Sequence, residues 1–140
     1  MNSVLAEQYS HGYLELIVGP MFSGKTSHLI TLYKQYELSG MKVCCINYKN
    51  DTRYDPSGNI TSHDNRTIPS INVITLSELE NQNKYFEYDV YLINEGQFFS
   101  DLFEHVVDLV DNKRKIVHIC GLNGDFQREN FGPLYKLYPM

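Results

Sequence analysis

The fold of this chain is decided by the stretch Gly19-Pro20-Met21-Phe22-Ser23-Gly24-Lys25-Thr26. This stretch matches the phosphate-binding pattern G-x-x-x-x-G-K-[ST] at every fixed position. Residues 13–18 before it predict a strand and residues 26–38 after it predict a helix, which is the context that the motif requires. In such a loop the backbone N–H groups and the helix dipole point at a phosphate, Lys25 adds a positive charge, and Thr26 offers a hydroxyl to Mg²⁺. The stretch therefore predicts a binding site for the phosphates of a nucleoside triphosphate.

Outside this stretch, short apolar runs alternate with helical patterns. Further strands are predicted at residues 42–48, 72–76, 89–94 and 116–120, with a short one at 134–138. Further helices are predicted over 101–112 and from a Ser77 cap through Glu80, and a long polar loop over 49–69. The alternation predicts an α/β fold of the P-loop NTPase type, with a mostly parallel sheet covered by helices on both faces.

Length, charge and cysteine content narrow the class of protein. The 140 residues predict one domain over 12–140, preceded by a loose N-terminus over 1–11. The net charge of −5 argues against a nucleic-acid-coating protein. Cys44, Cys45 and Cys120 form no C-x-x-C pair, so we expect buried thiols, no disulfide framework and no zinc. We find no signal-peptide pattern and no membrane-spanning apolar stretch, and we expect a cytoplasmic protein.

A second part of the site is predicted where the strand over 89–94 ends. An apolar strand that ends in acidic residues downstream of a phosphate-binding loop commonly supplies groups to Mg²⁺ and to the nucleophile. The metal position is Asn94, which carries no charge, so Mg²⁺ should be held less firmly than by a carboxylate. Ligands of parallel sheets bind at the carboxyl ends of the strands. We therefore expect the phosphate loop, Glu95 and the loop after Gly121 to meet in one cleft.

Further blocks of sequence make the pattern specific. They are Lys-Asn-Asp-Thr-Arg-Tyr at 49–54, Ser-His-Asp at 62–64, Glu-Gly-Gln-Phe-Phe at 95–99, Gly-Leu-Asn-Gly-Asp-Phe-Gln-Arg at 121–128 and Phe-Gly at 131–132. Together with the phosphate loop, and in this order, they closely resemble the type II thymidine kinases, the cellular and poxvirus-like family. The resemblance covers nearly the whole chain, from about Gly12 to Pro139.

The resemblance implies transfer of the γ-phosphoryl group of ATP to the 5′-hydroxyl of thymidine. It implies Glu95 as the catalytic base, with Lys25 and Arg53 contacting phosphates. It also implies a nucleoside pocket formed by Met21, Phe98, Leu122, Phe126 and Phe131. On the residues alone, Phe98 and Phe99 are more typical of core packing. Feedback binding of thymidine triphosphate and a homotetramer are further implications of the family.

Two departures from the family leave a second hypothesis open. The family has an aspartate where this chain has Asn94, and it continues beyond the position of Met140 with a four-cysteine zinc domain and a loop that closes over the nucleoside. The alternative hypothesis is a catalytically impaired nucleotide-binding fragment or regulatory paralogue. A generic P-loop ATPase would not explain the Asp-Thr-Arg-Tyr and Gly-Asp-Phe-Gln-Arg blocks.

Overall fold

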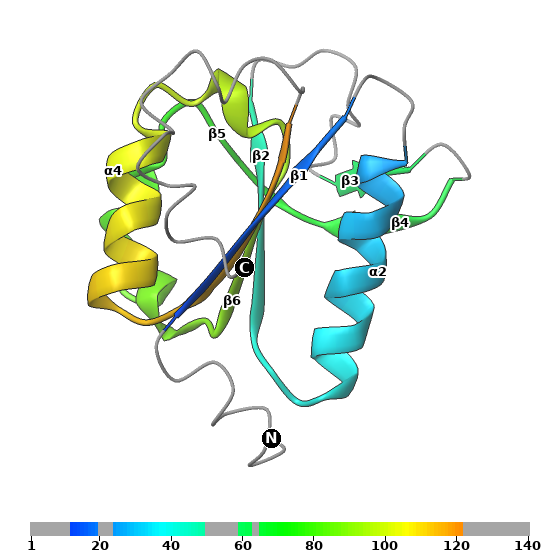
Figure 1. Ribbon diagram of the computed structural model, residues 1–140, viewed down its shortest axis with the longest axis horizontal. Helices are drawn as coiled ribbons and strands as arrows, with labels where there is room; N and C mark the ends of the chain where they lie inside the picture. The colour runs from blue at the N-terminus through cyan, green and yellow to red at the C-terminus, as the bar shows by residue number, and fades with distance from the viewer. Residues whose placement is uncertain (1–11, 20–23, 50–58, 63–64, 122–140) are drawn as a thin grey trace.

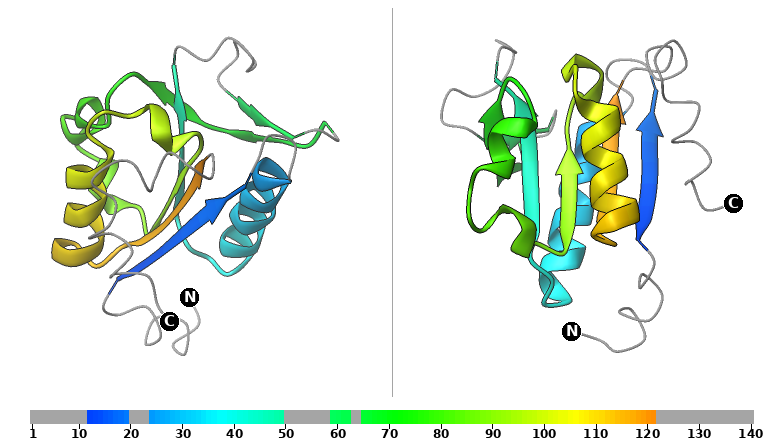
Figure 2. Two further views of the ribbon diagram at one scale, coloured as in Figure 1. Left: turned by 45° about the horizontal axis from the view of Figure 1, so that its top comes forward. Right: turned by 90° about the vertical axis from the view of Figure 1, so that its left-hand side faces the viewer.

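A computed structural model describes residues 12–19, 24–49, 59–62 and 65–121. Its centre is a five-stranded sheet in the order β1-β7-β6-β2-β5, in which all neighbouring strands are parallel. Figure 1 shows helix α2 on one side of the sheet and helix α4 on the other, and Figure 2 gives two further views. The predicted α/β architecture with a parallel sheet between helices is therefore confirmed.

The elements follow the predicted alternation closely. The strands of the main sheet are β1 (Tyr13–Val18), β2 (Val43–Tyr48), β5 (Ile71–Val73), β6 (Val90–Ile93) and β7 (Ile116–Gly121). The helical segments are α2 (Lys25–Leu38), α3 (Ser77–Glu80), η1 (Tyr85–Glu87), η2 (Gly96–Phe98), α4 (Leu102–Val107) and its π-helical continuation η3 (Asp108–Asn112). A separate antiparallel hairpin consists of β3 (Asn59–Thr61) and β4 (Thr67–Pro69).

The sheet has an apolar core on each face. Strand β6 shows why, because its four residues are all fully buried and alternate between the two sides. Val90 and Leu92 join the cluster under α2, whereas Tyr91 and Ile93 join the cluster under α3 and α4. A strand that is buried on both faces reads as a continuous apolar run, as the sequence indicated.

The prediction of a long polar loop over 49–69 is wrong for its second half. Residues 59–61 and 67–69 pair as β3 and β4, and Ile60 and Ile68 are buried in the cluster that contains Leu29 and Ile30 of α2. Each strand has three residues and a single buried side chain, which is too short a pattern to show a periodicity. The strand expected over 72–76 is β5, which ends at Val73.

The predicted Ser77 cap is also wrong. The N-cap position of α3 is Leu76, and no side chain of that position closes the helix end. The carboxylate of Asp101, which precedes α4, instead accepts hydrogen bonds from the backbone N–H groups of Leu76 and Ser77 at 3.1 and 2.9 Å. A carboxylate at a helix N-terminus is favoured by the helix dipole, so Asp101 caps α3 from outside.

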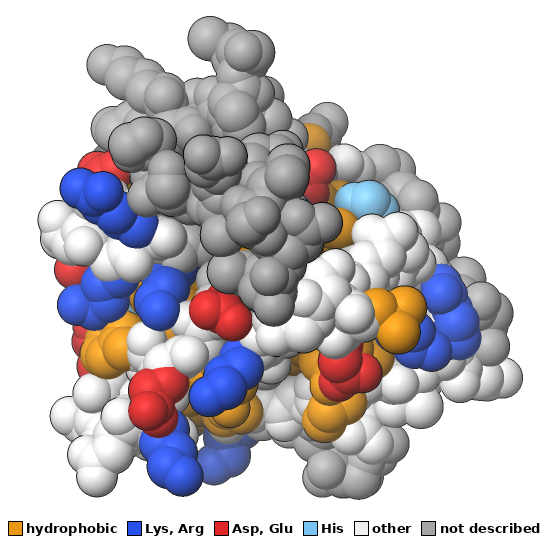
Figure 3. All heavy atoms as spheres, turned by 90° about the horizontal axis from the view of Figure 1, so that it is seen from below, with side chains coloured by type: hydrophobic (Ala, Val, Ile, Leu, Met, Phe, Trp, Pro, Cys, Tyr) orange, Lys and Arg blue, Asp and Glu red, His pale blue; other side chains and the backbone are white. Residues whose placement is uncertain are grey.

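In the part of the chain that the structure describes, no helix is long and apolar enough to cross a membrane. Figure 3 shows the molecule from below, where basic and acidic side chains of the described residues are interspersed. The predicted strand over 134–138 and the loose terminus over 1–11 lie outside the described residues.

Candidate active site

The described candidate residues lie where strands end. Because β1, β7, β6 and β2 are parallel neighbours, their carboxyl ends form one edge of the sheet. Helix α2 begins at that edge after β1, and Asn94 and Glu95 follow β6. Strand β7 separates these two groups, and it ends at the same edge. The parallel sheet thus brings the start of α2 and Glu95 to one side of the molecule, whereas the loop after Gly121, which we expected to meet them there, lies outside the described residues.

The start of α2 has the backbone geometry of a phosphate-binding loop end. Gly24 precedes the helix in the left-handed conformation, with φ 88° and ψ 11°. A residue with a Cβ atom adopts this conformation at a cost of about 1–2 kcal/mol, so glycine is favoured at this position. Gly24 is exposed and Thr26 is half-buried. The Nζ of Lys25 donates a 2.8 Å hydrogen bond to the carbonyl oxygen of Gly19, so the lysine spans the two ends of the loop.

Asn94 is not isolated at the end of β6. Its side chain is 1% exposed, and its Nδ2 donates a 3.2 Å hydrogen bond to Oδ1 of Asn47. Asn47 is 2% exposed and lies one residue before the end of β2, the strand that neighbours β6. Sequence reasoning missed Asn47; the available signal was a polar residue near the end of a buried apolar run. The pair fixes the orientation of the Asn94 amide.

The residues present fit a magnesium ion that is bound together with substrate phosphates. The Asn94 amide nitrogen bonds to Asn47, so its amide oxygen is the atom that can accept from a metal-bound water, and Thr26 has a hydroxyl oxygen. Mg²⁺ prefers oxygen ligands and often retains several waters. Among the described residues, no three His, Cys, Asp or Glu side chains are grouped so that they could hold a metal.

Glu95 adopts an uncommon backbone conformation. Its φ of 56° and ψ of 47° place it in the left-handed region, which is rare for a residue with a side chain. Its carboxylate Oε2 accepts a 2.6 Å hydrogen bond from Nε2 of Gln97, two residues later. The Oε1 atom of Gln97 is buried and has no hydrogen-bond partner among the residues that the structure describes. Sequence reasoning did not single out Gln97, although it lies inside the Glu-Gly-Gln-Phe-Phe block.

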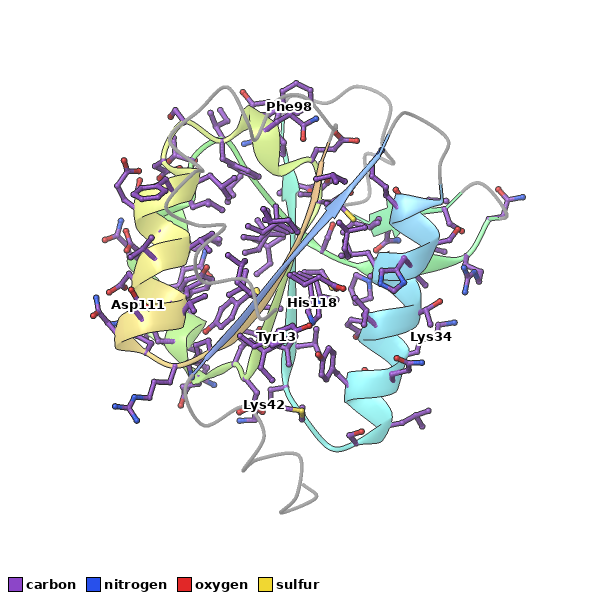
Figure 4. All side chains as sticks on the ribbon, viewed as in Figure 1. Tyr13, Lys34, Lys42, Phe98, Asp111 and His118 are labelled. Atoms are coloured by element: carbon purple, nitrogen blue, oxygen red, sulfur yellow. The ribbon has the colours of Figure 1, made fainter. Side chains whose placement is uncertain are left out.

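Phe98 and Phe99 have different environments. Phe98 is 44% exposed, whereas Phe99 is 4% exposed and belongs to the core under α4. Figure 4 shows Phe98 at the upper end of the molecule, where η2 follows β6. The half-buried ring of Tyr48 packs against Phe98 with ring centroids 5.3 Å apart. The structure therefore separates a core phenylalanine from an exposed one that can stack on a ligand, and it adds Tyr48 to the same edge.

The three cysteines are buried and free, as the sequence indicated. Burial raises the pKa of Cys44 and of Cys120 to about 12, so both thiols stay protonated at neutral pH. Cys120 lies at the end of β7, where its thiol donates a 3.3 Å hydrogen bond to the carbonyl oxygen of Lys25. Its role in this geometry is to hold the first residue of α2 against the sheet.

Several predicted site residues lie outside the described residues. These are Pro20, Met21, Phe22 and Ser23 of the loop, Arg53, and the pocket residues Leu122, Phe126 and Phe131. Their predicted roles remain predictions. The structure thus places the two ends of the loop, Lys25, Thr26, Asn94, Glu95 and Phe98, and leaves one wall of the expected nucleoside pocket undescribed.

The parallel sheet, the left-handed glycine before α2 and the residues at the strand ends define an α/β protein of the P-loop type. Comparison with known proteins gives the family. The family model described as "Thymidine kinase" matches residues 12–140. The chain therefore belongs to the thymidine kinase family.

Individual viral relatives agree with the family match. The thymidine kinase of Sheeppox virus (strain KS-1) is 37% identical over 130 residues, which cover 93% of this chain and 71% of that protein. The thymidine kinase of Yaba monkey tumor virus (strain VR587) is 39% identical over 128 residues, which cover 91% of this chain and 68% of that protein. The thymidine kinase of Myxoma virus (strain Uriarra) is 34% identical, and the match covers 92% and 70% of the two chains.

Proposed function

We propose that this chain is a thymidine kinase that transfers the γ-phosphoryl group of ATP to the 5′-hydroxyl of thymidine. The observation that carries the proposal is the placement of the α2 N-terminus and of Glu95 at one edge of the sheet, on either side of the end of β7. A phosphoryl donor at the helix and an acceptor hydroxyl at the carboxylate need such an arrangement. Family membership supports the substrate class.

Each group at this edge has a role in the proposed reaction. Lys25 releases the Gly19 carbonyl oxygen and neutralises charge on the β- and γ-phosphates, while the backbone N–H groups of the loop over 19–26, other than at Pro20, bind phosphate oxygens. Thr26 and Asn94 would hold magnesium together with the substrate phosphates, and the bound ion would shield the phosphate charge. Arg53, whose guanidinium can form two hydrogen bonds to a phosphate, stabilises the transferred group.

Glu95 is the proposed base for the 5′-hydroxyl. The left-handed backbone costs about 1–3 kcal/mol, and such costs are concentrated at functional sites. Gln97 donates a hydrogen bond to one oxygen of the Glu95 carboxylate and so orients the group that accepts the hydroxyl proton. The strained backbone and the Gln97 bond together fix the direction in which the carboxylate points.

The proposed nucleoside pocket begins at Phe98. Its exposed ring can stack on the pyrimidine, with Tyr48 supporting it from behind, and Met21, Leu122, Phe126 and Phe131 complete the pocket. We also propose feedback binding of thymidine triphosphate at this site, assembly as a homotetramer, and a cytoplasmic location. The first two proposals rest on the resemblance to the family, whereas the location rests on the free, buried cysteines, which suit a reducing compartment.

The test is transfer of labelled phosphate from ATP to thymidine in the presence of Mg²⁺. The chain should phosphorylate thymidine, and Lys25→Ala and Glu95→Gln should each reduce turnover by at least roughly 100-fold. Turnover of the unchanged chain no higher than that of Lys25→Ala would refute the proposal. Tight ATP binding in calorimetry without turnover would instead favour a nucleotide-binding paralogue, for which the neutral Asn94 is the motivating observation.

A further inference from the structure

A chain of polar side chains crosses the interface between α2 and the sheet, away from the residues discussed above. The hydroxyl of Tyr36 on α2 lies 2.8 Å from Nε2 of His118 on β7. The other ring nitrogen of His118 lies 2.7 Å from Oε1 of Glu15 on β1. Figure 4 shows His118 and Tyr13 between the sheet and α2. We call Glu15, His118 and Tyr36 the anchor network.

The anchor network places polar side chains where burial is unfavourable in free energy. His118 is 2% exposed and Tyr36 is 8% exposed, and they lie beside an otherwise apolar cluster. Buried polar groups destabilise a fold by several kcal/mol unless they are paired, and well-packed apolar residues often stabilise such sites equally well. Unlike apolar contacts, hydrogen bonds between paired polar groups depend on direction, so they fix the relative positions of the elements that they join. Glu15 and His118 occupy directly paired positions on β1 and β7, so the two side chains share the face that α2 covers.

The anchor network holds the same helix that begins the phosphate site. Tyr36 lies about three turns, or about 16 Å, along α2 from Lys25. At the start of that helix, Cys120 donates to the carbonyl oxygen of Lys25. Cys120 and His118 are two residues apart on β7 and therefore lie on the same face of the strand. Strand β7 thus contacts α2 through polar groups at both ends of the helix.

A further histidine faces the network from the helix. Nε2 of His28, in the first turn of α2, lies 3.9 Å from Oε1 of Glu15. The hydrogen bond from His118 lowers the pKa of Glu15, and burial only partly offsets this, so the ionised carboxylate is the form that the network favours. The carboxylate of β1 therefore bonds to β7 through His118 and faces α2 at His28.

We propose that Glu15, His118 and Tyr36 are positioning residues for the phosphate donor. They fix the position of α2 along β1 and β7, and with it the position of Lys25 and Thr26 at the helix N-terminus. The inference rests on the proposed binding of ATP at that end. It assigns a functional effect to three residues that touch no substrate.

The opposite face of the sheet offers a matched control. There the hydroxyl of Tyr85 lies 2.5 Å from Nε2 of His105, and Nδ1 of His105 lies 3.7 Å from Glu80. Tyr85 and His105 are buried, at 2% and 5% exposure, like Tyr36 and His118. This second Tyr-His-Glu group connects η1, α3 and α4, and none of these elements carries a described residue of the phosphate site.

The experiment compares Tyr36→Phe with Tyr85→Phe. Each removes one hydroxyl that bonds to a buried imidazole, so the two variants should lose similar unfolding free energy. Only Tyr36→Phe should weaken ATP binding in calorimetry and raise KM for ATP, by roughly 2- to 30-fold, the usual range for residues that act through packing. KM for thymidine should not change. Equal ATP affinities for the two variants would overturn the inference.

Glu15, whose side chain is partly exposed, provides a second test that does not disturb the core. Glu15→Ala removes the partner of His118 and should weaken ATP binding, whereas Glu15→Gln restores an acceptor oxygen and should recover most of it. Unchanged ATP affinity in Glu15→Ala would also overturn the inference. The unchanged chain is the reference for both tests. If it binds no ATP, the proposed phosphate site and this inference fail together, whereas binding that is equal in all variants refutes the inference alone.

Discussion

Replacing Gly96 by alanine would place a methyl group inside the contact between η2 and β7. An added Cβ atom would lie 2.5 Å from Cγ2 of Ile119 and 3.3 Å from Cδ2 of Leu102. Carbon atoms pack at about 3.5–4.0 Å, so the first contact is about 1 Å too short. Ile119 and Leu102 are 0% and 1% exposed, so neither side chain can move toward solvent.

The expected cost follows from this geometry. Added methyl groups in well-packed cores destabilise by about 1–3 kcal/mol, and a contact this short should lie near the upper end. For a chain of this size the loss corresponds to a decrease in Tm of roughly 6–12 °C. Because Gly96 directly follows Glu95, any shift of η2 should also reduce kcat.

The cause can be tested with a compensating substitution. Ile119→Leu moves the branch from Cβ to Cγ and so removes the clashing Cγ2 atom at nearly constant volume, at a cost below about 1.5 kcal/mol. We expect Gly96→Ala combined with Ile119→Leu to be more stable than the sum of the single changes by about 1 kcal/mol or more, as measured by urea denaturation. Additive losses, or a Gly96→Ala variant as stable as the unchanged chain, would refute the steric argument.

Three further predictions concern the site and the pH dependence of stability. Gln97→Ala removes the donor on Glu95 and should reduce kcat roughly 10- to 100-fold with unchanged ATP affinity, as steady-state kinetics and calorimetry would show; an unchanged kcat contradicts the positioning role. In Asn94→Asp, the Asn47 amide can rotate so that its nitrogen donates to the new carboxylate. This variant should reach half-maximal activity at a roughly tenfold lower Mg²⁺ concentration. Identical Mg²⁺ titrations would show that the neutral amide does not weaken Mg²⁺ binding. Burial lowers the pKa of His105 from 6.5, although the charge of Glu80 opposes the shift. The imidazole therefore binds a proton more readily in the unfolded chain than in the folded one, so the free energy of unfolding decreases as pH falls below about 6.5. His105→Gln should therefore show a flatter decline of unfolding free energy between pH 7.5 and 5, and equal slopes would contradict this origin.

The sequence predicted the features that rest on local pattern. The motif at 19–26 predicted the strand before it and the helix after it, and continuous apolar runs predicted β2, β6 and β7. The hairpin of β3 and β4 was missed because each strand buries one side chain, and no period can be read from one residue.

The remaining features depend on which segments become neighbours. The sequence could not predict that Asp101 caps α3. Asp101 lies 25 positions after Leu76 and 24 positions after Ser77, the two residues whose N–H groups it binds. The Asn47–Asn94 pair and the anchor network depend on strand order, which an alternation of strands and helices leaves open. The difference between Phe98 and Phe99 depends on where η2 turns the chain, so adjacent identical residues were indistinguishable before the fold was known.

The position of β7 has a consequence for the order of events as the chain is made. In the described part of the chain, β1 pairs with β7 alone, so the first strand of the sheet has no neighbour until one of the last described segments arrives. Contacts between distant segments form late, because long loops must close first. During synthesis the ribosome therefore releases residues 19–26, the proposed phosphate-binding stretch, long before the strand β7 that holds β1 in place. We expect a nascent chain that stops before Ile116 to expose the apolar face of β1 to chaperones and to bind no nucleotide.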